Sequence, residues 1–289
     1  MTDRQLDKFY TKKDLAKELY NILLSEMNLT GEELFLEPSA GNGSFSSLCQ
    51  NVEAYDIKPE GPNIIEADFL KLTLENKHFI TIGNPPFGSR CSLAVEFFNK
   101  SAEVSDTIAM ILPSTFMKWS IQSQLDKNFQ LVYTKKLQED AFTFQESDYS
   151  VRTYFMIWTK YPLPNQKNQR ILSNPPISHP DFKIWQHNAT AGSRKFVDEP
   201  WEIATWRQGY NNYNEIFTHD DYEKVKDMVY NTGKQFFFIK PLNEKAKKII
   251  SLMDFNELAK RNLSTPGFGK RDFVSYYTEL LNNFNQKHL

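Results

Sequence analysis

Residues 33–45, ELFLEPSAGNGSF, contain a short apolar strand followed by an acid, a proline and a loop of small residues with two glycines. A second short stretch, residues 52–59 (VEAYDIKP), is also predicted to be a strand that ends in an acid. Ligands of open α/β sheets bind at the carboxyl ends of the strands. We therefore expect Glu37, Asp56 and the loop after the first strand to lie together at one binding edge.

Strands and helices alternate over roughly the first 160 residues, a pattern typical of a parallel sheet. Apolar residues at helical spacing predict helices at 12–27 and 91–103. Strands are predicted at residues 34–36, 52–59, 63–70, 78–83, 106–116, 130–137 and 151–160. This order predicts a doubly wound, mostly parallel, Rossmann-like α/β sheet.

Residues 160–170 (KYPLPNQKNQR) are rich in proline, asparagine and glutamine and have no periodicity, so they predict a domain boundary. We expect one domain at 1–162 and a smaller C-terminal α+β region at 163–289, with helices at 242–260 and 271–284. The second part holds 18 Lys and Arg against 14 Asp and Glu, or +4, which leaves 16 against 22, or −6, for the first. This difference in net charge fits a catalytic domain joined to a substrate-binding domain, although chance would also produce it.

The composition excludes several classes of protein. The chain has 289 residues, a formal net charge of −2, no apolar run of about eighteen residues and no signal-peptide core at its start. Cys49 and Cys91 form no CxxC pair, and the five histidines are scattered. We therefore expect no metal site, no membrane span and a reducing compartment such as the cytoplasm.

The loop after the first strand contains GxG but not the full GxGxxG fingerprint of dinucleotide-binding sheets. Small residues at Gly41 and Gly43 let a ligand approach the backbone closely. An acid directly before the loop, Glu37, repels phosphate and suits a ligand that carries a positive charge. Asp56 follows 19 residues later, where a carboxylate grips ribose hydroxyls. A tight structural turn remains the alternative interpretation of the glycines alone.

Residues 78–90, HFITIGNPPFGSR, end a predicted strand in Asn84-Pro85-Pro86-Phe87. Two prolines cannot sit inside a helix or a central strand, so the four residues form a rigid turn at the strand end. A second Asn-Pro-Pro, residues 174–176, has a shorter apolar lead-in and no aromatic residue after it. We expect this second copy to be a loop.

Four segments within residues 34–87, namely LEPSAGNGSF, AYDIKP, ADFL and GNPPF, resemble those of S-adenosylmethionine-dependent amino-methyltransferases, in particular the adenine N6-methyltransferases of DNA. The N-terminal KFYTKKDLAKEL is similar to the cofactor motif that precedes the glycine loop in that family. The order of the segments resembles the subgroup with a trailing target-recognition region. The resemblance implies a methyltransferase sheet at 1–162 and target recognition at 163–289. The setting it implies is restriction-modification in the cytoplasm of a bacterium or a phage-infected cell.

The resemblance also implies a role for each cofactor residue. Gly41 and Gly43 would make room for the cofactor, and Glu37 would lie near its amino-acid and sulfonium end. Asp56 would hold the ribose, and Asp68 would accept from the adenine amino group. The implied cofactor set is Tyr10 and Thr11 at the methionine carboxylate, Glu37, Pro38, Ser39, Ala40, Gly41, Gly43, Asp56, Ile57, Asp68, Phe69 against the adenine ring, and Asn84.

The chemistry of Asn84-Pro85-Pro86-Phe87 agrees with that resemblance. An exocyclic amine on an aromatic ring is a poor nucleophile, and two acceptors around its hydrogens stabilise the positive charge that develops on attack. The Asn84 side-chain oxygen and the Pro85 carbonyl are candidates, and Phe87 offers a face to a flipped-out base. Pro86 keeps the turn rigid. These four residues are the predicted catalytic residues, and the reaction needs neither a metal nor a nucleophilic side chain.

Residues 182–238 are rich in aromatic side chains. Arg194, Lys195, Trp206, Arg207 and Tyr210 are candidates for nucleic-acid binding, through stacking and phosphate contacts. A small aromatic core with solvated charges is the alternative for each of them. The expected partner is double-stranded DNA, and the recognised sequence and the oligomeric state are left open. An RNA adenine N6-methyltransferase, a protein-glutamine methyltransferase and a non-catalytic nucleic-acid-binding protein are the alternative functions.

Overall fold

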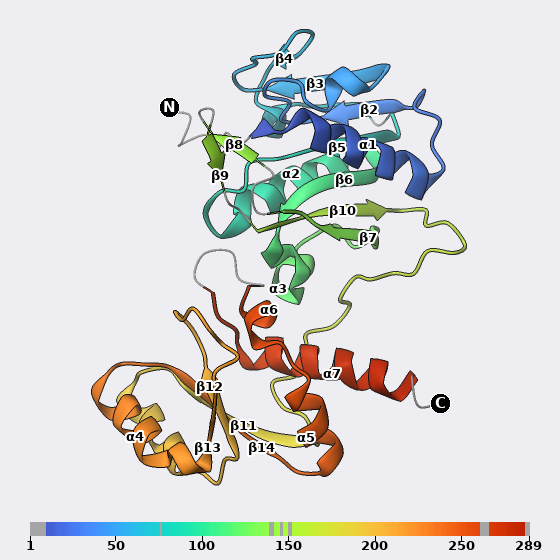
Figure 1. Cartoon of the computed structure of the whole chain (residues 1–289). Helices are drawn as coiled ribbons and strands as arrows, with labels where there is room; N and C mark the ends of the chain where they lie inside the picture. The colour runs from blue at the N-terminus through green and yellow to red at the C-terminus, as the bar shows by residue number, and fades with distance from the viewer. Residues whose placement is uncertain are drawn as a thin grey trace. The chain divides into compact units, whose positions relative to one another are not determined.

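A computed structural model describes residues 10–75, 77–138, 142–144, 147–149, 152–260 and 266–286 (Figure 1). The chain divides into two compact units, with the division between Leu172 and Ser173. The division lies ten residues after the position expected from the sequence, 162. Each unit has its own sheet and its own hydrophobic core.

The first unit contains a seven-stranded sheet in the order β4-β3-β2-β5-β6-β10-β7. Its strands are β2 (Leu34–Glu37), β3 (Asn51–Asp56), β4 (Ile65–Glu66), β5 (Phe79–Gly83), β6 (Ser105–Pro113), β7 (Gln130–Lys136) and β10 (Thr153–Thr159). β2 through β6 pair in parallel, and β10 runs antiparallel to both β6 and β7. The predicted doubly wound α/β fold is therefore confirmed.

The strand order reverses at β2, which has β3 on one side and β5 on the other. Such a switch point opens a crevice at the carboxyl ends of the strands, where ligands bind in open α/β sheets. Both Glu37, the last residue of β2, and the turn after Gly83, the last residue of β5, lie at this crevice. The fold thus brings together the two segments that the sequence marked for chemistry.

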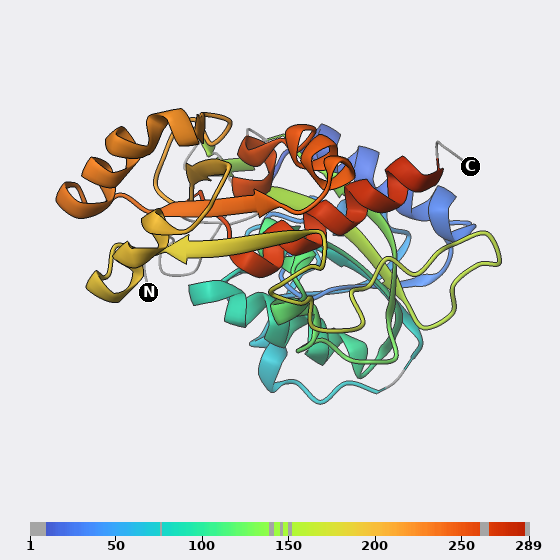
Figure 2. The same ribbon diagram turned by 90° about the horizontal axis from the view of Figure 1, so that it is seen from below.

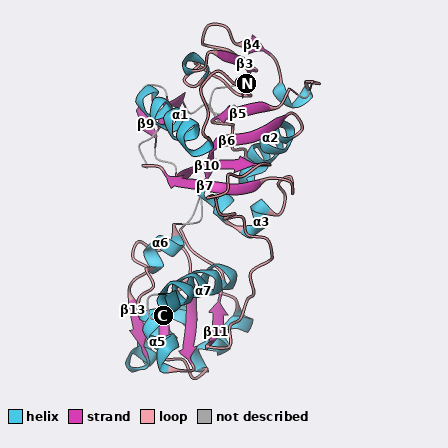
Figure 3. Ribbon diagram, turned by 90° about the vertical axis from the view of Figure 1, so that its right-hand side faces the viewer, coloured by secondary structure: helices cyan, strands magenta, loops and turns pink. Residues whose placement is uncertain are grey.

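Helices cover both faces of this sheet (Figure 3). α1 (Lys13–Met27) buries Leu19 and Leu23 in the cluster that contains Phe35 of β2. α2 (Ser92–Ala102) buries Phe97 on the other face, in the cluster of Leu36. Neighbouring residues of β2 serve opposite faces because side chains alternate along a strand. The remaining short elements of this unit are the helix α3 (Trp119–Gln122) and the 3-10 turns η2 (Ser46–Leu48), η3 (Phe69–Lys71), η4 (Ser89–Cys91) and η5 (Ser114–Met117).

Two differences from the expected elements have local causes. The strand expected at 63–70 is only two residues long, because the backbone turns into η3 at Phe69. A small three-stranded sheet, β1-β8-β9, was not expected, since its pairing joins segments far apart in the chain. It consists of β1 (Tyr10–Thr11), β8 (Phe142–Phe144) and β9 (Ser147–Tyr149).

Arg170 fixes the segment after β10 to the first unit. Its Nη1 donates to the carbonyls of Asp126 and Phe129, at 2.6 and 2.8 Å, and its Nη2 donates to those of Gln122 and Leu125, both at 2.8 Å. The guanidinium also lies over the ring of Trp158, 5.8 Å from the centroid. A segment without helix or strand periodicity is therefore part of the first unit rather than a free linker.

The second unit is an antiparallel sheet in the order β11-β14-β12-β13, with helices packed against it. Figure 2 shows β11 and β14 side by side. Its elements are β11 (Phe182–His187), η6 (Ala191–Asp198), β12 (Ile203–Trp206), β13 (Ile216–Thr218), η7 (His219–Asp221), α4 (Tyr222–Asn231), β14 (Phe236–Pro241), α5 (Glu244–Ser251), α6 (Phe255–Ala259) and α7 (Lys270–Gln286). The predicted smaller α+β region is confirmed. The helix expected at 242–260 is broken because the Asp254 side chain caps α6 by accepting from the Glu257 N–H.

Replacing Arg170 with alanine should destabilise the first unit by about 2 kcal/mol, because four carbonyls lose a charged donor. Urea denaturation measures the change. Lys167→Ala, an exposed neighbour in the same segment, is the matched control and should leave the midpoint nearly unchanged. Equal midpoints for both variants would contradict the role given to Arg170.

Candidate active site

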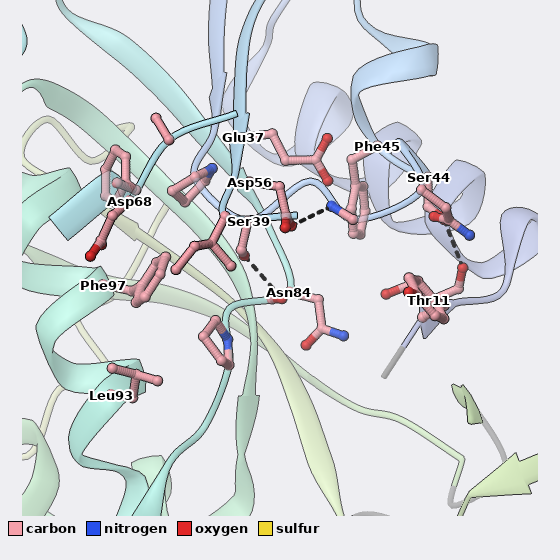
Figure 4. A pocket seen from close by; sticks show the side chains of 18 of the residues that line it. Thr11, Glu37, Ser39, Ser44, Phe45, Asp56, Asp68, Asn84, Leu93 and Phe97 are labelled. Carbon is pink, nitrogen blue, oxygen red and sulfur yellow. Dashed lines mark hydrogen bonds between the residues drawn. The ribbon is translucent and has the colours of Figure 1, made fainter. Parts of the chain in front are cut away.

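A cavity of about 320 Å³ lies at the carboxyl edge of the large sheet, around the ends of β2, β3 and β5. Figure 4 shows Thr11 and Phe97 on opposite sides of it, with Asn84 between them. It is lined by Tyr10, Thr11, Glu37, Pro38, Ser39, Gly41, Asn42, Ser44, Phe45, Asp56, Ile57, Ala67, Asp68, Phe69, Leu70, Asn84, Pro86, Leu93 and Phe97. Its size lies within the range usual for small-molecule sites.

Most of the residues predicted for the cofactor line this cavity, but four of the predicted cofactor and catalytic residues do not. Ala40 and Gly43 lie in the loop but outside the cavity wall, and so do Pro85 and Phe87 of the predicted turn. The residues that the sequence missed are Asn42, Ser44, Phe45, Ala67, Leu70, Leu93 and Phe97. Asn42, Ser44 and Phe45 belong to the glycine loop, so their nearness in sequence to the predicted residues was the available signal. Leu93 and Phe97 lie one helical turn apart on α2, on the face that packs toward the sheet.

The glycine loop is fastened to the neighbouring strand by Asp56. Its Oδ2 accepts from the Gly41 N–H at 2.7 Å, and its Oδ1 accepts from the Lys58 N–H at 2.8 Å. Gly41 has φ +53°, and a Cβ on it would lie 3.2 Å from the ring of Tyr10. Each carboxylate oxygen of Asp56 can accept a second hydrogen bond. Asp56 therefore orders the loop and retains acceptor capacity for a ligand.

Glu37 is a buried acid in the cavity wall, with 2% of its surface exposed. Its Oε2 accepts from the Ser46 N–H at 2.7 Å. The pKa of Glu37 is raised to about 8, mainly by burial and in part by the nearby Asp56 carboxylate, while the Ser46 hydrogen bonds act in the opposite direction. A cationic group that entered the cavity would favour the ionised form.

A hydrogen bond joins Ser44 of the glycine loop to the short strand β1, and both line the cavity. The Ser44 hydroxyl donates to the backbone carbonyl of Thr11 at 2.9 Å, and Asn42 Oδ1 lies 2.7 Å from the same hydroxyl. The Thr11 Oγ1 is buried and has no hydrogen-bond partner among the residues that the structure describes. A hydroxyl in that position can donate to an acceptor on a ligand.

Asp68 and Phe69 form another part of the wall. Phe69 is 2% exposed and stacks on Phe97, with ring centroids 5.6 Å apart. Asp68 pairs with Lys71 at 2.8 Å and keeps about a third of its side chain exposed. Phe69 thus offers a fixed apolar surface, and Asp68 offers an accessible acceptor beside it.

A hydrogen bond ties the Asn84 turn to the glycine loop. The Ser39 hydroxyl donates to the backbone carbonyl of Asn84 at 3.2 Å (Figure 4). Asn84 and Pro86 line the cavity, whereas Phe87 is only 8% exposed and lies outside its wall. The second Asn-Pro-Pro, residues 174–176, lies in irregular backbone, as predicted.

The candidates for nucleic-acid binding lie in the second unit. Trp206 is 3% exposed and stacks on Tyr210, with centroids 3.9 Å apart and planes 4° apart. The interpretation as an aromatic core therefore holds for Trp206, which has no open face for a base. Arg194 lies over the ring of Tyr230 at 5.4 Å, and Lys195 is exposed.

Two further searches over the described parts of the chain gave negative results. These residues contain no group of three or more His, Cys, Asp and Glu side chains that could hold a metal ion. They also contain no helix that is both long and apolar enough to cross a membrane.

Comparison with known proteins found no matching family model and no matching curated protein. Similar solved structures include a putative RNA methyltransferase from Pyrococcus horikoshii, 19% identical, with a TM-score of 0.44, covering 55% of this chain and 90% of that one. The type IIL restriction-modification enzyme MmeI, solved with DNA, is 8% identical, with a TM-score of 0.46, covering 91% and 64%.

A third similar structure is the methyltransferase subunit of a type I restriction-modification system from Streptococcus thermophilus. It is 14% identical, with a TM-score of 0.40, and the match covers 85% of this chain and 58% of that one. This chain thus spans less than two thirds of both restriction-modification proteins. With TM-scores below 0.5, these likenesses carry no information about the chemistry of this chain.

The raised pKa of Glu37 predicts that stability falls as pH rises. An unfolded Glu37 loses its proton near pH 4.5, whereas the folded one keeps it to about pH 8. Between these values the unfolded state binds fewer protons, so the free energy of unfolding should drop by up to about 1.4 kcal/mol per pH unit. Urea denaturation at several pH values measures this slope.

Glu37→Gln is the control, because glutamine does not titrate and keeps the shape of the side chain. The variant should be less sensitive to pH between 4.5 and 8 than the native protein. If the two slopes coincide, Glu37 does not have a raised pKa.

Proposed function

We propose that this chain is an S-adenosylmethionine-dependent DNA methyltransferase that transfers a methyl group to N6 of a flipped-out adenine. The observation that carries the proposal is the cavity that Asn84 and Pro86 share with Glu37, Asp56 and the glycine loop. A ligand in this cavity would contact Asn84 of the turn and the acids at the strand ends together.

The cavity residues fit the chemical groups of S-adenosylmethionine. The buried Glu37 suits the positive charge of the ligand, and Asp56 can accept from ribose hydroxyls. The unpartnered Thr11 hydroxyl can donate to the methionine carboxylate. Phe69 suits the adenine ring, and Asp68 can accept from its amino group. When bound, the cofactor supplies a methyl group on a positively charged sulfur.

The Asn84 turn supplies the acceptors for the target amine. We assign the Asn84 side-chain oxygen and the Pro85 carbonyl as acceptors from the two N6 hydrogens. As the new N–C bond forms and the methyl–sulfur bond breaks, the positive charge moves from sulfur to N6, where two fixed dipoles stabilise it. One N6 proton then leaves to solvent, because neither acceptor is basic enough to keep it.

Two features position these acceptors. Prolines at 85 and 86 have no N–H and a fixed φ, so the two proline nitrogens add no donor that competes for the Pro85 carbonyl. Phe87 is the residue that we assign to stack on the flipped base. Because its ring is nearly buried, stacking requires the side chain to turn outward.

The direct test is transfer of labelled methyl from S-adenosylmethionine to duplex DNA, followed by identification of the methylated base. N6-methyladenine in DNA supports the proposal. Faster methylation of structured RNA would favour the RNA alternative, and methylated glutamine in protein would favour a protein substrate. Cofactor binding without any labelled nucleic acid would contradict the proposal.

Asn84→Ala should lower the turnover number by roughly 10²–10³-fold, the usual loss for one preorganised contact to developing charge. The dissociation constant of S-adenosylmethionine should change little, since cofactor contacts come mainly from the other wall residues. Asn174→Ala, in the second Asn-Pro-Pro, is the matched control and should retain native turnover. Near-native turnover of Asn84→Ala would refute the assignment.

Binding of S-adenosylmethionine at pH 7 should release close to one proton, because Glu37 must ionise to pair with the cation. The affinity should therefore rise as pH increases toward about 8. Calorimetry in two buffers of different ionisation enthalpy counts the protons. Glu37→Gln should bind more weakly and release none. Unchanged proton release in this variant would show that another group titrates.

A further inference from the structure

At one end of the four-stranded sheet of the second unit, cationic and amide side chains lie next to the ends of two neighbouring strands. β12 ends at Trp206 and β14 begins at Phe236, and these two residues pair directly. Just beyond this pair the Arg207 N–H donates to the Gln235 carbonyl at 2.9 Å. Arg207 and Gln208 therefore lie beside Lys234 and Gln235.

Arg207 has neutral partners in place of a counter-ion. Its Nη1 donates to the side-chain carbonyls of Gln235 and, at 3.4 Å, Gln208. Its Nε is buried and has no hydrogen-bond partner among the described residues. Burial lowers the pKa of the Arg207 guanidinium. A half-buried cation without an anion is costly. A ligand that offers acceptors would offset that cost.

The surrounding carboxylates do not supply this anion. Glu215 lies in the connection between β12 and β13. Its Oε2 accepts from the Trp206 indole N–H at 2.9 Å. Within the described residues Arg207 and Lys234 make no ion pair. The Lys234 Nζ lies over the rings of Trp206 and Tyr210, 5.2 and 5.7 Å from the centroids.

The backbone that carries Arg207 and Gln208 is held rigidly. The Phe268 N–H donates to the Arg207 carbonyl at 3.1 Å, and the Gly209 N–H donates to the Pro266 carbonyl at 3.1 Å. A Cβ on Gly267 would lie 2.7 Å from the Arg207 carbonyl oxygen, so only glycine permits this approach. Side chains that must match the geometry of a ligand need such a fixed support.

We propose that Arg207 and Gln208 read base edges in the major groove of DNA, with Arg207 on guanine and Gln208 on adenine. Gln235 is a positioning residue that holds the guanidinium plane, and Lys234 contacts a backbone phosphate. An arginine fork matches guanine O6 and N7, and a glutamine amide matches adenine N6 and N7. Because the Arg207 Nη1 donates to Gln208 and Gln235, the fork of Nη1 and Nη2 opens when Gln208 turns from Arg207 to its own base. This inference rests on the proposed function, and it predicts at least one G·C pair in the recognised sequence.

The test reads the methylated sequence directly. The full chain and its variants are expressed in cells that lack N6-methyladenine, and their DNA is sequenced for that base. Arg207→Lys and Gln208→Ala should each relax one position of the sequence, with about tenfold to hundredfold less discrimination there. Gln235→Ala should relax the same position as Arg207→Lys. Asn283→Ala, on an exposed part of α7, is the matched control and should change nothing.

Lys234→Ala provides the contrast between phosphate contact and base contact. It should weaken methylation at every site alike, leave the sequence unchanged and reduce the salt dependence of DNA binding by about one phosphate contact. A relaxed sequence in this variant, with unchanged salt dependence, would overturn the division of roles between Lys234 and Arg207.

The failures of the two proposals are distinguishable. If the native protein methylates adenine at one sequence, and Arg207→Lys and Gln208→Ala methylate that sequence with the same discrimination, only the assignment of Arg207 and Gln208 to base reading is overturned. No N6-methyladenine in DNA from cells with the native protein, or methylation of RNA only, overturns the proposed function and this inference together. Gln208 is exposed, so Gln208→Ala keeps the test decisive if Arg207→Lys fails to fold.

Discussion

A hydrogen bond from the Ser39 hydroxyl to the Asn84 carbonyl joins the glycine loop to the Asn-Pro-Pro turn. The peptide units before Pro85 and Pro86 have no N–H, so hydrogen bonds can hold these two units only through their carbonyls. Ser39 holds the first carbonyl, and the Pro85 carbonyl is the acceptor that we assign to the target amine. The geometry of the proposed reaction therefore depends on a loop that also lines the cavity proposed for the cofactor.

Much of the first unit could be predicted because its signals are local. Short apolar strands that end in Glu37, Asp56 or Gly83 mark both the parallel sheet and its binding edge, and the structure gathers these ends around one cavity. The burial of Phe87 could not be predicted, since packing against distant residues decides which way a side chain points after a turn. Arg170 gave no signal either, because its partners are four backbone carbonyls.

The second unit shows the limit of composition as a guide. Its aromatic residues suited either a stacking surface or a core, and the sequence could not separate the two. Trp206 belongs to the core, whereas Arg207 and Gln208 lie beside it at the end of the sheet. The distinction depends on strand register, because the pairing of Trp206 with Phe236 decides which residues fall beyond the paired ends. Register is a property of two strands and is not visible in either alone.

The most direct measurement is the turnover number and the cofactor dissociation constant of Ser39→Ala and Ser39→Thr. If one hydrogen bond couples the loop to the turn, Ser39→Ala should lower turnover by roughly tenfold while the dissociation constant stays within about threefold of native. Ser39→Thr keeps a hydroxyl and should recover most of the loss. Native turnover in Ser39→Ala, or a loss confined to cofactor affinity, would contradict the account.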